Sequence, residues 1–187
     1  MTYAQICESV ARLLRQYGDS DPARLCREMG IQLLYQPLGS HPGAIKGYFI
    51  VCKRIRAITV NMDLPPVMQR IITAHELGHA VHHKSSRAQA FHDVVLFDQT
   101  SALEKEANLF AAELLLTDEA VVDVLNQDMT FYSAASQLQV PMELLDFKFR
   151  IMKWKGYKLT EPPEAASSTF LKNMGVPQDG YSEDGFT

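Results

Sequence analysis

The stretch Ala74-His75-Glu76-Leu77-Gly78-His79-Ala80 decides how the rest of the chain must be arranged. On a helix, residues four positions apart share a face, so His75 and His79 can present imidazole nitrogens to one metal ion. Two neutral histidines fit Zn²⁺, and a third protein ligand leaves the fourth position for a water molecule whose pKa falls to about 7. Glu76, about 100° further round the helix, can accept that water's proton as it attacks a carbonyl.

The residues around this stretch favour a buried helix. Two prolines, 65 and 66, suit its first turn, and Val67, Ile71 and Ile72 have the apolar spacing of a helix in a core. Gly78 costs about 1 kcal/mol relative to alanine in mid-helix, which indicates that a neighbour packs too closely there for a Cβ. The alternative is an amphipathic helix whose histidines make ordinary hydrogen bonds in the core.

A third ligand is expected from the helix that follows. Ser101 with Glu104 three residues later matches a capping box, and apolar side chains repeat at helical spacing from there. The carboxylates of this helix are Glu104, Glu106 and Glu113. Glu106 and Glu113 share a face, whereas Glu104 and Glu106 are about 200° apart and cannot both point at one metal. Periodicity does not choose among the three.

Two blocks of the sequence together resemble the ImmA/IrrE family of metallopeptidases. These are the run 74–83 and Glu104-Lys105-Glu106-Ala107-Asn108-Leu109-Phe110-Ala111-Ala112-Glu113-Leu114-Leu115, which match HELGH and E-A-N-x-F-A-A-x-L-L. Carried over by position, the glutamate before Ala-Asn is implied to be the third metal ligand, which is Glu106. One departure is that Thr117-Asp118 follows where the family often has a proline, which affects the end of the helix more than the site.

The resemblance implies a gluzincin-like site, with His75, His79 and Glu106 as metal ligands and Glu76 as the general base. The implied activity is that of a zinc-dependent metalloendopeptidase. The resemblance further implies a regulatory role, in which the protease cleaves a DNA-binding, helix-turn-helix repressor. Such a repressor is often encoded by a phage or another mobile element. Nitrogen and oxygen ligands also fit Mn²⁺ or Fe²⁺.

The implied fold is α+β, a zincin-like core with a short antiparallel sheet beside the HExxH helix and additional C-terminal helices. The residue pattern agrees, because 44–61 reads as a β-hairpin that leads into the metal helix. In zincins an extended substrate commonly lies along a sheet edge, so one strand in this range is expected to bind it by strand addition.

The domain organisation follows from length and composition. At 187 residues the chain suits one domain, expected over residues 1–156, and the Pro- and Gly-containing segment 157–187 reads as a flexible polar tail. After the metal helix, residues 88–100 are expected to form either a loop or a short strand at Val94-Val95-Leu96-Phe97. Further elements are expected at helices 3–17 and 22–29, strand 31–35, and helices 118–126, 130–138 and 142–155.

Charge and cysteine usage favour a cytoplasmic protein. The net charge of −4 argues against a broad phosphate-binding surface, and Cys7, Cys26 and Cys52 are widely spaced, as reduced thiols are. The N-terminus lacks the basic and apolar regions of a signal peptide, and no apolar run approaches a membrane span.

The main alternative function is DNA binding, with the metal site purely structural. Residues 134–145 resemble a helix-turn-helix in outline, and several basic residues follow: Lys148, Arg150, Lys153, Lys155 and Lys158. Against this, the turn lacks a glycine, cations are expected at a helix C-terminus anyway, and the net charge is negative. His83 is expected to support the metal ligands rather than bind the ion itself.

Overall fold

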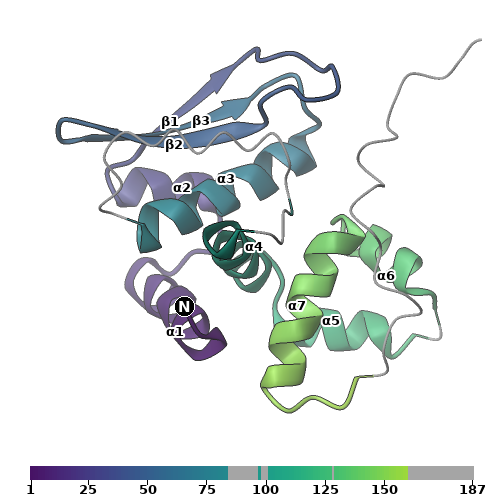
Figure 1. The fold of residues 1–187 in the computed structure, drawn as a ribbon. Coiled ribbons are helices and arrows are strands. Elements are labelled where there is room, and N and C mark those ends of the chain that lie inside the picture. The colour runs from purple at the N-terminus through teal and green to yellow at the C-terminus, as the bar shows by residue number, and fades with distance from the viewer. Residues whose placement is uncertain (84–96, 98–100, 128, 160–187) are drawn as a thin grey trace, which may run out of the picture.

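The computed structural model describes residues 1–83, 97, 101–127 and 129–159 (Figure 1). The segment expected to form a loop or short strand (88–100) and the expected tail (157–187) therefore lie largely outside the described residues. The elements are α1 (Tyr3–Tyr17), α2 (Pro22–Glu28), β1 (Gln32–Gln36), β2 (Gly47–Cys52), β3 (Ile55–Asn61), α3 (Pro66–His82), α4 (Ala102–Leu115), α5 (Asp118–Leu125), α6 (Phe131–Gln137) and α7 (Met142–Trp154).

Most helix starts follow from side chains that satisfy the first free backbone N–H groups. Thr2 and Gln5 form a capping box at α1, and Asp21 accepts from the backbone of Arg24 at α2. Thr117 and Thr130 cap α5 and α6 in the same way. Proline at the first position begins α3, as the sequence predicts.

The sheet has three strands in the order β1-β3-β2. β2 and β3 form the expected antiparallel hairpin, which pairs Cys52 with Ile55 across a two-residue turn. β1 pairs with β3 in parallel, from Gln32 opposite Ala57 to Gln36 opposite Asn61. The α+β class is confirmed, and the sheet is mixed rather than purely antiparallel, because β1 and β2 lie on opposite sides of the central strand.

Two residues fix the path of the chain into β2. Asn61 is fully buried, and its amide donates to the carbonyls of Gly39 and Ile45 at 2.8 and 3.0 Å, which holds the loop that precedes β2. At Gly47 a Cβ would overlap Cγ2 of Ile72 and crowd the backbone oxygen of Thr59. Glycine there lets β2 lie directly on α3.

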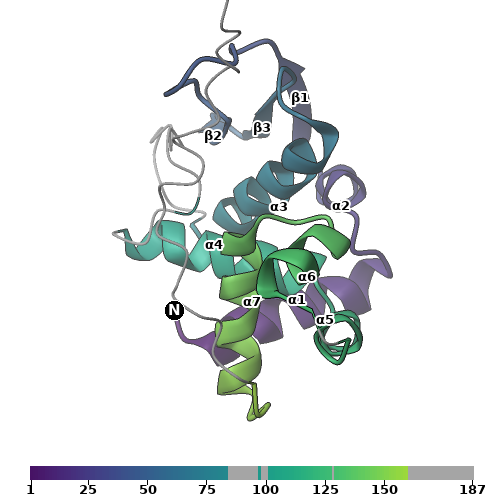
Figure 2. The ribbon, with the colours of Figure 1, turned by 90° about the vertical axis from the view of Figure 1, so that its right-hand side faces the viewer.

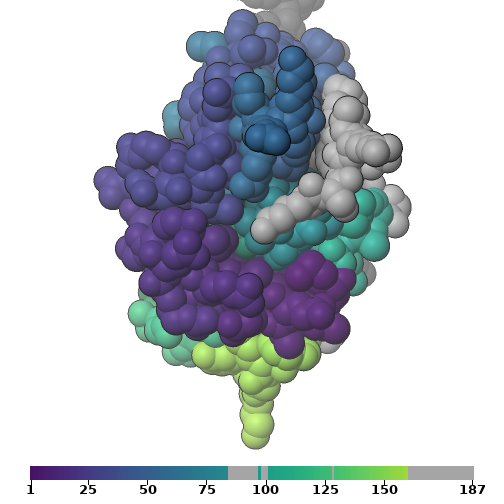
Figure 3. All heavy atoms as spheres, turned by 90° about the vertical axis from the view of Figure 1, so that its left-hand side faces the viewer, coloured from purple at the N-terminus to yellow at the C-terminus, as the bar shows by residue number. Residues whose placement is uncertain are grey.

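The elements form layers around α3. The sheet covers one side of α3 and α2, and α4 crosses α3 on the other side, with α1 and α7 packed against α4 (Figures 1 and 2). The face in Figure 3 shows α1 and α2, in purple, as one continuous surface beneath the strands.

The crossing of α3 and α4 depends on Gly78. A Cβ at this position would lie 3.1 Å from Cδ1 of Phe110 and 3.2 Å from Cα of Ala107. This confirms the expectation that a neighbour packs closely at Gly78. The two helices approach with almost no side-chain volume between them, which brings the polar residues of α4 within reach of the histidines of α3.

The hydrophobic core has two parts, and α7 contributes to both. Leu144, Phe147 and Ile151 join the larger cluster with α1, α3, α4 and the sheet. Leu145 and Met152 join a smaller cluster with α5 and α6. Because α7 is buried on two faces, it connects the C-terminal helices to the core that holds the histidines.

A charged network reinforces this connection. The side chain of Lys148 is 1% exposed and donates to Oε2 of Glu113 at 2.6 Å, and it also pairs with Asp118. Lys155 pairs with the same two acids at 2.7 and 2.8 Å. Burial alone would raise the pKa of Asp118, but the hydrogen bonds from Lys148 and Lys155 bring it below its ordinary value. Burial, with a contribution from Glu113, raises the pKa of Cys7 in α1 to about 11, so this thiol stays protonated.

Lys148→Met should therefore destabilise the fold. Removing one partner of a buried ion pair leaves uncompensated charge, which costs on the order of 3 kcal/mol, and Lys155 keeps the loss from being larger. The measurement is urea unfolding followed by circular dichroism. The matched control is Lys158→Met at an exposed position, which should change the midpoint little; equal midpoints for the two variants would contradict the proposed role of the network.

Candidate metal centre

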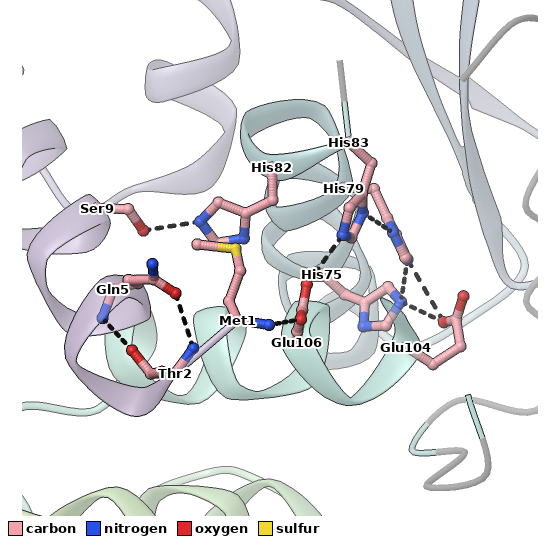
Figure 4. Close-up of polar contacts among 10 residues, drawn as sticks. All are labelled: Met1, Thr2, Gln5, Ser9, His75, His79, His82, His83, Glu104 and Glu106. Carbon is pink, nitrogen blue, oxygen red and sulfur yellow. Dashed lines mark hydrogen bonds and ion pairs between the residues drawn. The ribbon is translucent and has the colours of Figure 1, made fainter. Parts of the chain in front are cut away.

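Three side chains from two helices converge in the buried core. Nε2 of His75 lies 3.0 Å from Nε2 of His79, and Oε2 of Glu104 lies 3.2 and 3.4 Å from these two nitrogens (Figure 4). The histidines are 1% and 0% exposed, and the glutamate is 12% exposed. The helical spacing of α3 places the two imidazoles on one face, and α4 brings the carboxylate to them.

These three atoms fit a tetrahedral metal ion. With zinc bonds of about 2.0–2.1 Å, two ligands of a tetrahedral site are about 3.3 Å apart. The three observed distances scatter around this value. Two imidazole nitrogens and a carboxylate oxygen also match the donor set of hydrolytic zinc sites. The residues His75, His79 and Glu104 thus form a possible metal site.

The nitrogens on the far side of the two imidazoles are also engaged. Nδ1–H of His75 donates to Oδ1 of Asn108, a buried residue of α4, at 2.8 Å. An amide oxygen can only accept, so Nδ1 of His75 carries a proton, and in this tautomer of the neutral imidazole Nε2 has the lone pair that a metal needs. Nδ1 of His79 lies 3.0 Å from Nδ1 of His83.

Glu106 lies elsewhere. Its Oε2 is 3.2 Å from Nε2 of His83, and its Oε1 pairs with the amino group of Met1 (Figure 4). The structure therefore brings Glu104 beside the two histidines, whereas Glu106, the ligand carried over from the family block, contacts His83. Burial, together with the neighbouring His79, lowers the pKa of His83 to about 4, so this imidazole is neutral at pH 7.

The expected capping box at the start of α4 is wrong. Ser101 is the N-cap, but it makes no side-chain hydrogen bond there. Glu104 does not fold back onto the backbone because its carboxylate is directed at the histidines. One signal in the sequence points to this arrangement: Glu104 and Asn108 are four apart and share a helix face, and a buried asparagine on that face can orient a histidine.

Glu76 is fully buried on α3, and its Cγ lies beside Gly47 at the start of β2. Further along, Nη2 of Arg56 in β3 donates to the carbonyl of Ala80 at 2.8 Å. The hairpin of β2 and β3 thus runs along α3 past both histidines. β3 is the central strand, so among the described residues β2 is the open sheet edge on this side of the site.

His82 and the basic residues of α7 make contacts elsewhere in the fold. Nε2 of His82 lies 2.8 Å from Oγ of Ser9 in α1 (Figure 4), and its ring meets the ring of His83 edge to face. The basic residues of α7 are engaged within the fold: Lys148 and Lys155 with acids, Arg150 with Asp146 at 2.6 Å, and Lys153 over the ring of Phe149.

The second helix of the helix-turn-helix pattern is α7, and eight of its residues are buried. A recognition helix must expose its face to the major groove. The structure therefore gives no support to the DNA-binding alternative. Among the helices of the described residues, none is long and apolar enough to cross a bilayer.

Comparisons with known proteins agree with this site. The model of the IrrE N-terminal-like domain, a peptidase family, matches residues 26–150. A protein of Bacillus phage phi105 named uncharacterized immunity region protein 2 is 33% identical over 146 residues, which cover 78% of this chain and 90% of the relative. Metallopeptidase ImmA of Bacillus subtilis (strain 168) is 30% identical over 149 residues, which cover 76% of this chain and 83% of the relative. With two histidines of an HExxH helix beside a glutamate of the next helix, and with this likeness over most of its length, the chain belongs to the ImmA/IrrE family of metallopeptidases.

Proposed function

We propose that this protein is a zinc-dependent endopeptidase in which His75, His79 and Glu104 hold the metal and Glu76 is the general base. The observation that carries the proposal is the convergence of the three ligand atoms at 3.0–3.4 Å in the core. Glu104 replaces Glu106 in this ligand set because it is the carboxylate beside both imidazoles. The set remains of the gluzincin type, two histidines of HExxH with a downstream glutamate.

Each residue has a defined task in peptide hydrolysis. A bound zinc ion supplies a Lewis acid that polarises the scissile carbonyl and activates water near neutral pH. Glu76 accepts the proton of the attacking water and passes it to the leaving amine. The burial of Glu76 beside Gly47 keeps this carboxylate in a fixed position at the sheet edge. A purely structural metal site would not require a glutamate there.

The substrate is proposed to be a protein segment bound in extended form along β2. The two-residue turn closes on the pair Cys52–Ile55, and hydrogen-bonded pairs alternate along an antiparallel ladder. The N–H groups of Phe49 and Val51 therefore face the open edge. A peptide that adds to this edge passes the metal site, because the hairpin runs along α3.

A helix-turn-helix repressor is the proposed protein substrate. The support is the likeness to a protein from a phage immunity region and to Metallopeptidase ImmA. We also propose that the protein acts in the cytoplasm, where its three cysteines, all free in the structure, would remain reduced.

Metal binding should stabilise the fold. Zinc at about 100 times its dissociation constant adds about 2.7 kcal/mol to the free energy of unfolding, which raises the melting temperature by roughly 5–10 °C for a chain of this size. Differential scanning fluorimetry with zinc, and then with a chelator, measures the shift. His79→Ala and Glu104→Ala should show almost none; full retention of the shift in Glu104→Ala would exclude Glu104 as a ligand.

Glu76→Gln should separate metal binding from catalysis. The variant keeps the three ligands, so zinc content should equal that of the parent, while hydrolysis falls by about 10²–10⁴-fold because the proton acceptor is lost. Cleavage of a proteome-derived peptide library, followed by mass spectrometry, gives the rates. A candidate repressor can be tested with the same pair of proteins. Hydrolysis at the parental rate would show that Glu76 is not the base.

Val51→Pro tests the strand edge. Proline removes the N–H that faces the open side of β2 without removing a hydrogen bond to β3, so kcat/KM for the best library peptide should fall about tenfold or more with unchanged zinc affinity. Val51→Ala is the matched control, because it shortens the side chain and keeps the N–H. Equal losses in the two variants would assign the effect to the side chain and reject strand addition at this residue.

A further inference from the structure

Behind the ligand cluster lies a second chain of polar contacts that metal ligation does not require. It runs from Nδ1 of His79 to Nδ1 of His83 at 3.0 Å, and from Nε2 of His83 to Oε2 of Glu106 at 3.2 Å. The side chains of His83 and Glu106 are 8% and 13% exposed. This chain leads away from the metal position to a carboxylate from α4, whose other oxygen pairs with the amino group of Met1 (Figure 4).

The proton positions along this chain follow from its two ends. A carboxylate only accepts, so Nε2–H of His83 donates to Glu106. At the other end, a metal needs the lone pair on Nε2 of His79, so His79 carries its proton on Nδ1. This Nδ1–H then donates to Nδ1 of His83.

We propose that His83 and Glu106 are positioning residues that orient His79 and fix its tautomer. This proposal rests on the function proposed above. It adds an explanation of how the imidazole ring of His79 is oriented for metal binding. The two zinc-binding histidines are then held differently: His75 by a neutral amide, Asn108, and His79 through a second imidazole by an anion. Both glutamates of Glu104-Lys105-Glu106 serve the site, the first as a ligand and the second behind it.

The backbone makes this arrangement rigid. His83 is the C-cap of α3, four residues after His79, and its N–H bonds to the carbonyl of His79 at 2.9 Å. Glu106 projects from the helix that also carries Glu104 and Asn108. Motion of α4 relative to α3 would thus disturb the ligand and both positioning contacts together.

The test is a double-mutant cycle of His83→Ala and Glu106→Gln in the full chain, with zinc affinity measured by competition with a chromogenic chelator. Each single variant should bind zinc about 10–100-fold more weakly than the parent. The double variant should be no weaker than His83→Ala alone, because Glu106 acts on His79 only through His83. Glu119→Gln, the same chemical change at an exposed position, should bind like the parent.

Two further measurements separate positioning from ligation and from folding. The absorption spectrum of the cobalt-substituted Glu106→Gln variant should keep a tetrahedral form, and the melting temperatures of the metal-free variants should stay close to that of the metal-free parent. Parental affinity in both single variants, or additive losses in the double variant, would overturn the proposal. If Glu106→Gln lost zinc as completely as His79→Ala, the proposal would also be overturned, because Glu106 would then be a ligand. A parent protein that binds no zinc would instead remove the proposed function itself, and this proposal with it.

Discussion

The close crossing of α3 and α4 is the constraint on which the site depends. Gly78 has no side chain, so the backbone of Ala107 and the ring of Phe110 rest against α3 between the two histidines. A wider separation would move every carboxylate of α4 away from the imidazoles. Glycine costs about 1 kcal/mol in mid-helix, and the packing that it permits offsets this cost.

The same crossing buries polar groups that an apolar core would not contain. His75, His79, Glu76 and Asn108 are each no more than 1% exposed. Such groups are costly unless their hydrogen-bonding atoms have partners, so only one register of the two helices is favourable. A displacement of α4 by one residue along its axis would separate Asn108 from His75, and it would separate Glu104 from both histidines. The polar cluster therefore selects the alignment of the helices as well as preparing a metal site.

The sequence predicts much of the fold and two of the three proposed metal ligands. Periodicity locates α3 and α4, and the i, i+4 spacing alone places His75 and His79 on one face. To choose between Glu104 and Glu106, one must know which face of α4 is turned toward α3. That rotation depends on tertiary packing around Gly78 and cannot be read from a helical wheel. Glu104 also matched a capping box, because a glutamate three residues after a serine satisfies that local pattern whether or not its carboxylate has a partner elsewhere. The position of Glu106 within the family block implied that it is the third ligand, whereas in the structure its carboxylate contacts His83.

The C-terminal helices also show that a local sequence pattern does not determine how a helix packs in the fold. The spacing of α6 and α7 resembles a helix-turn-helix, yet α7 lies between two apolar clusters and its buried lysine pairs with Glu113 of α4. A cation that reads as surface charge in the sequence instead joins two helices in the core. Because Glu113 and Glu104 belong to one rigid helix, the contacts of α7 restrain the element that carries the proposed third ligand. The C-terminal helices thus support the proposed metal site through their packing against α4, although none of their residues reaches it.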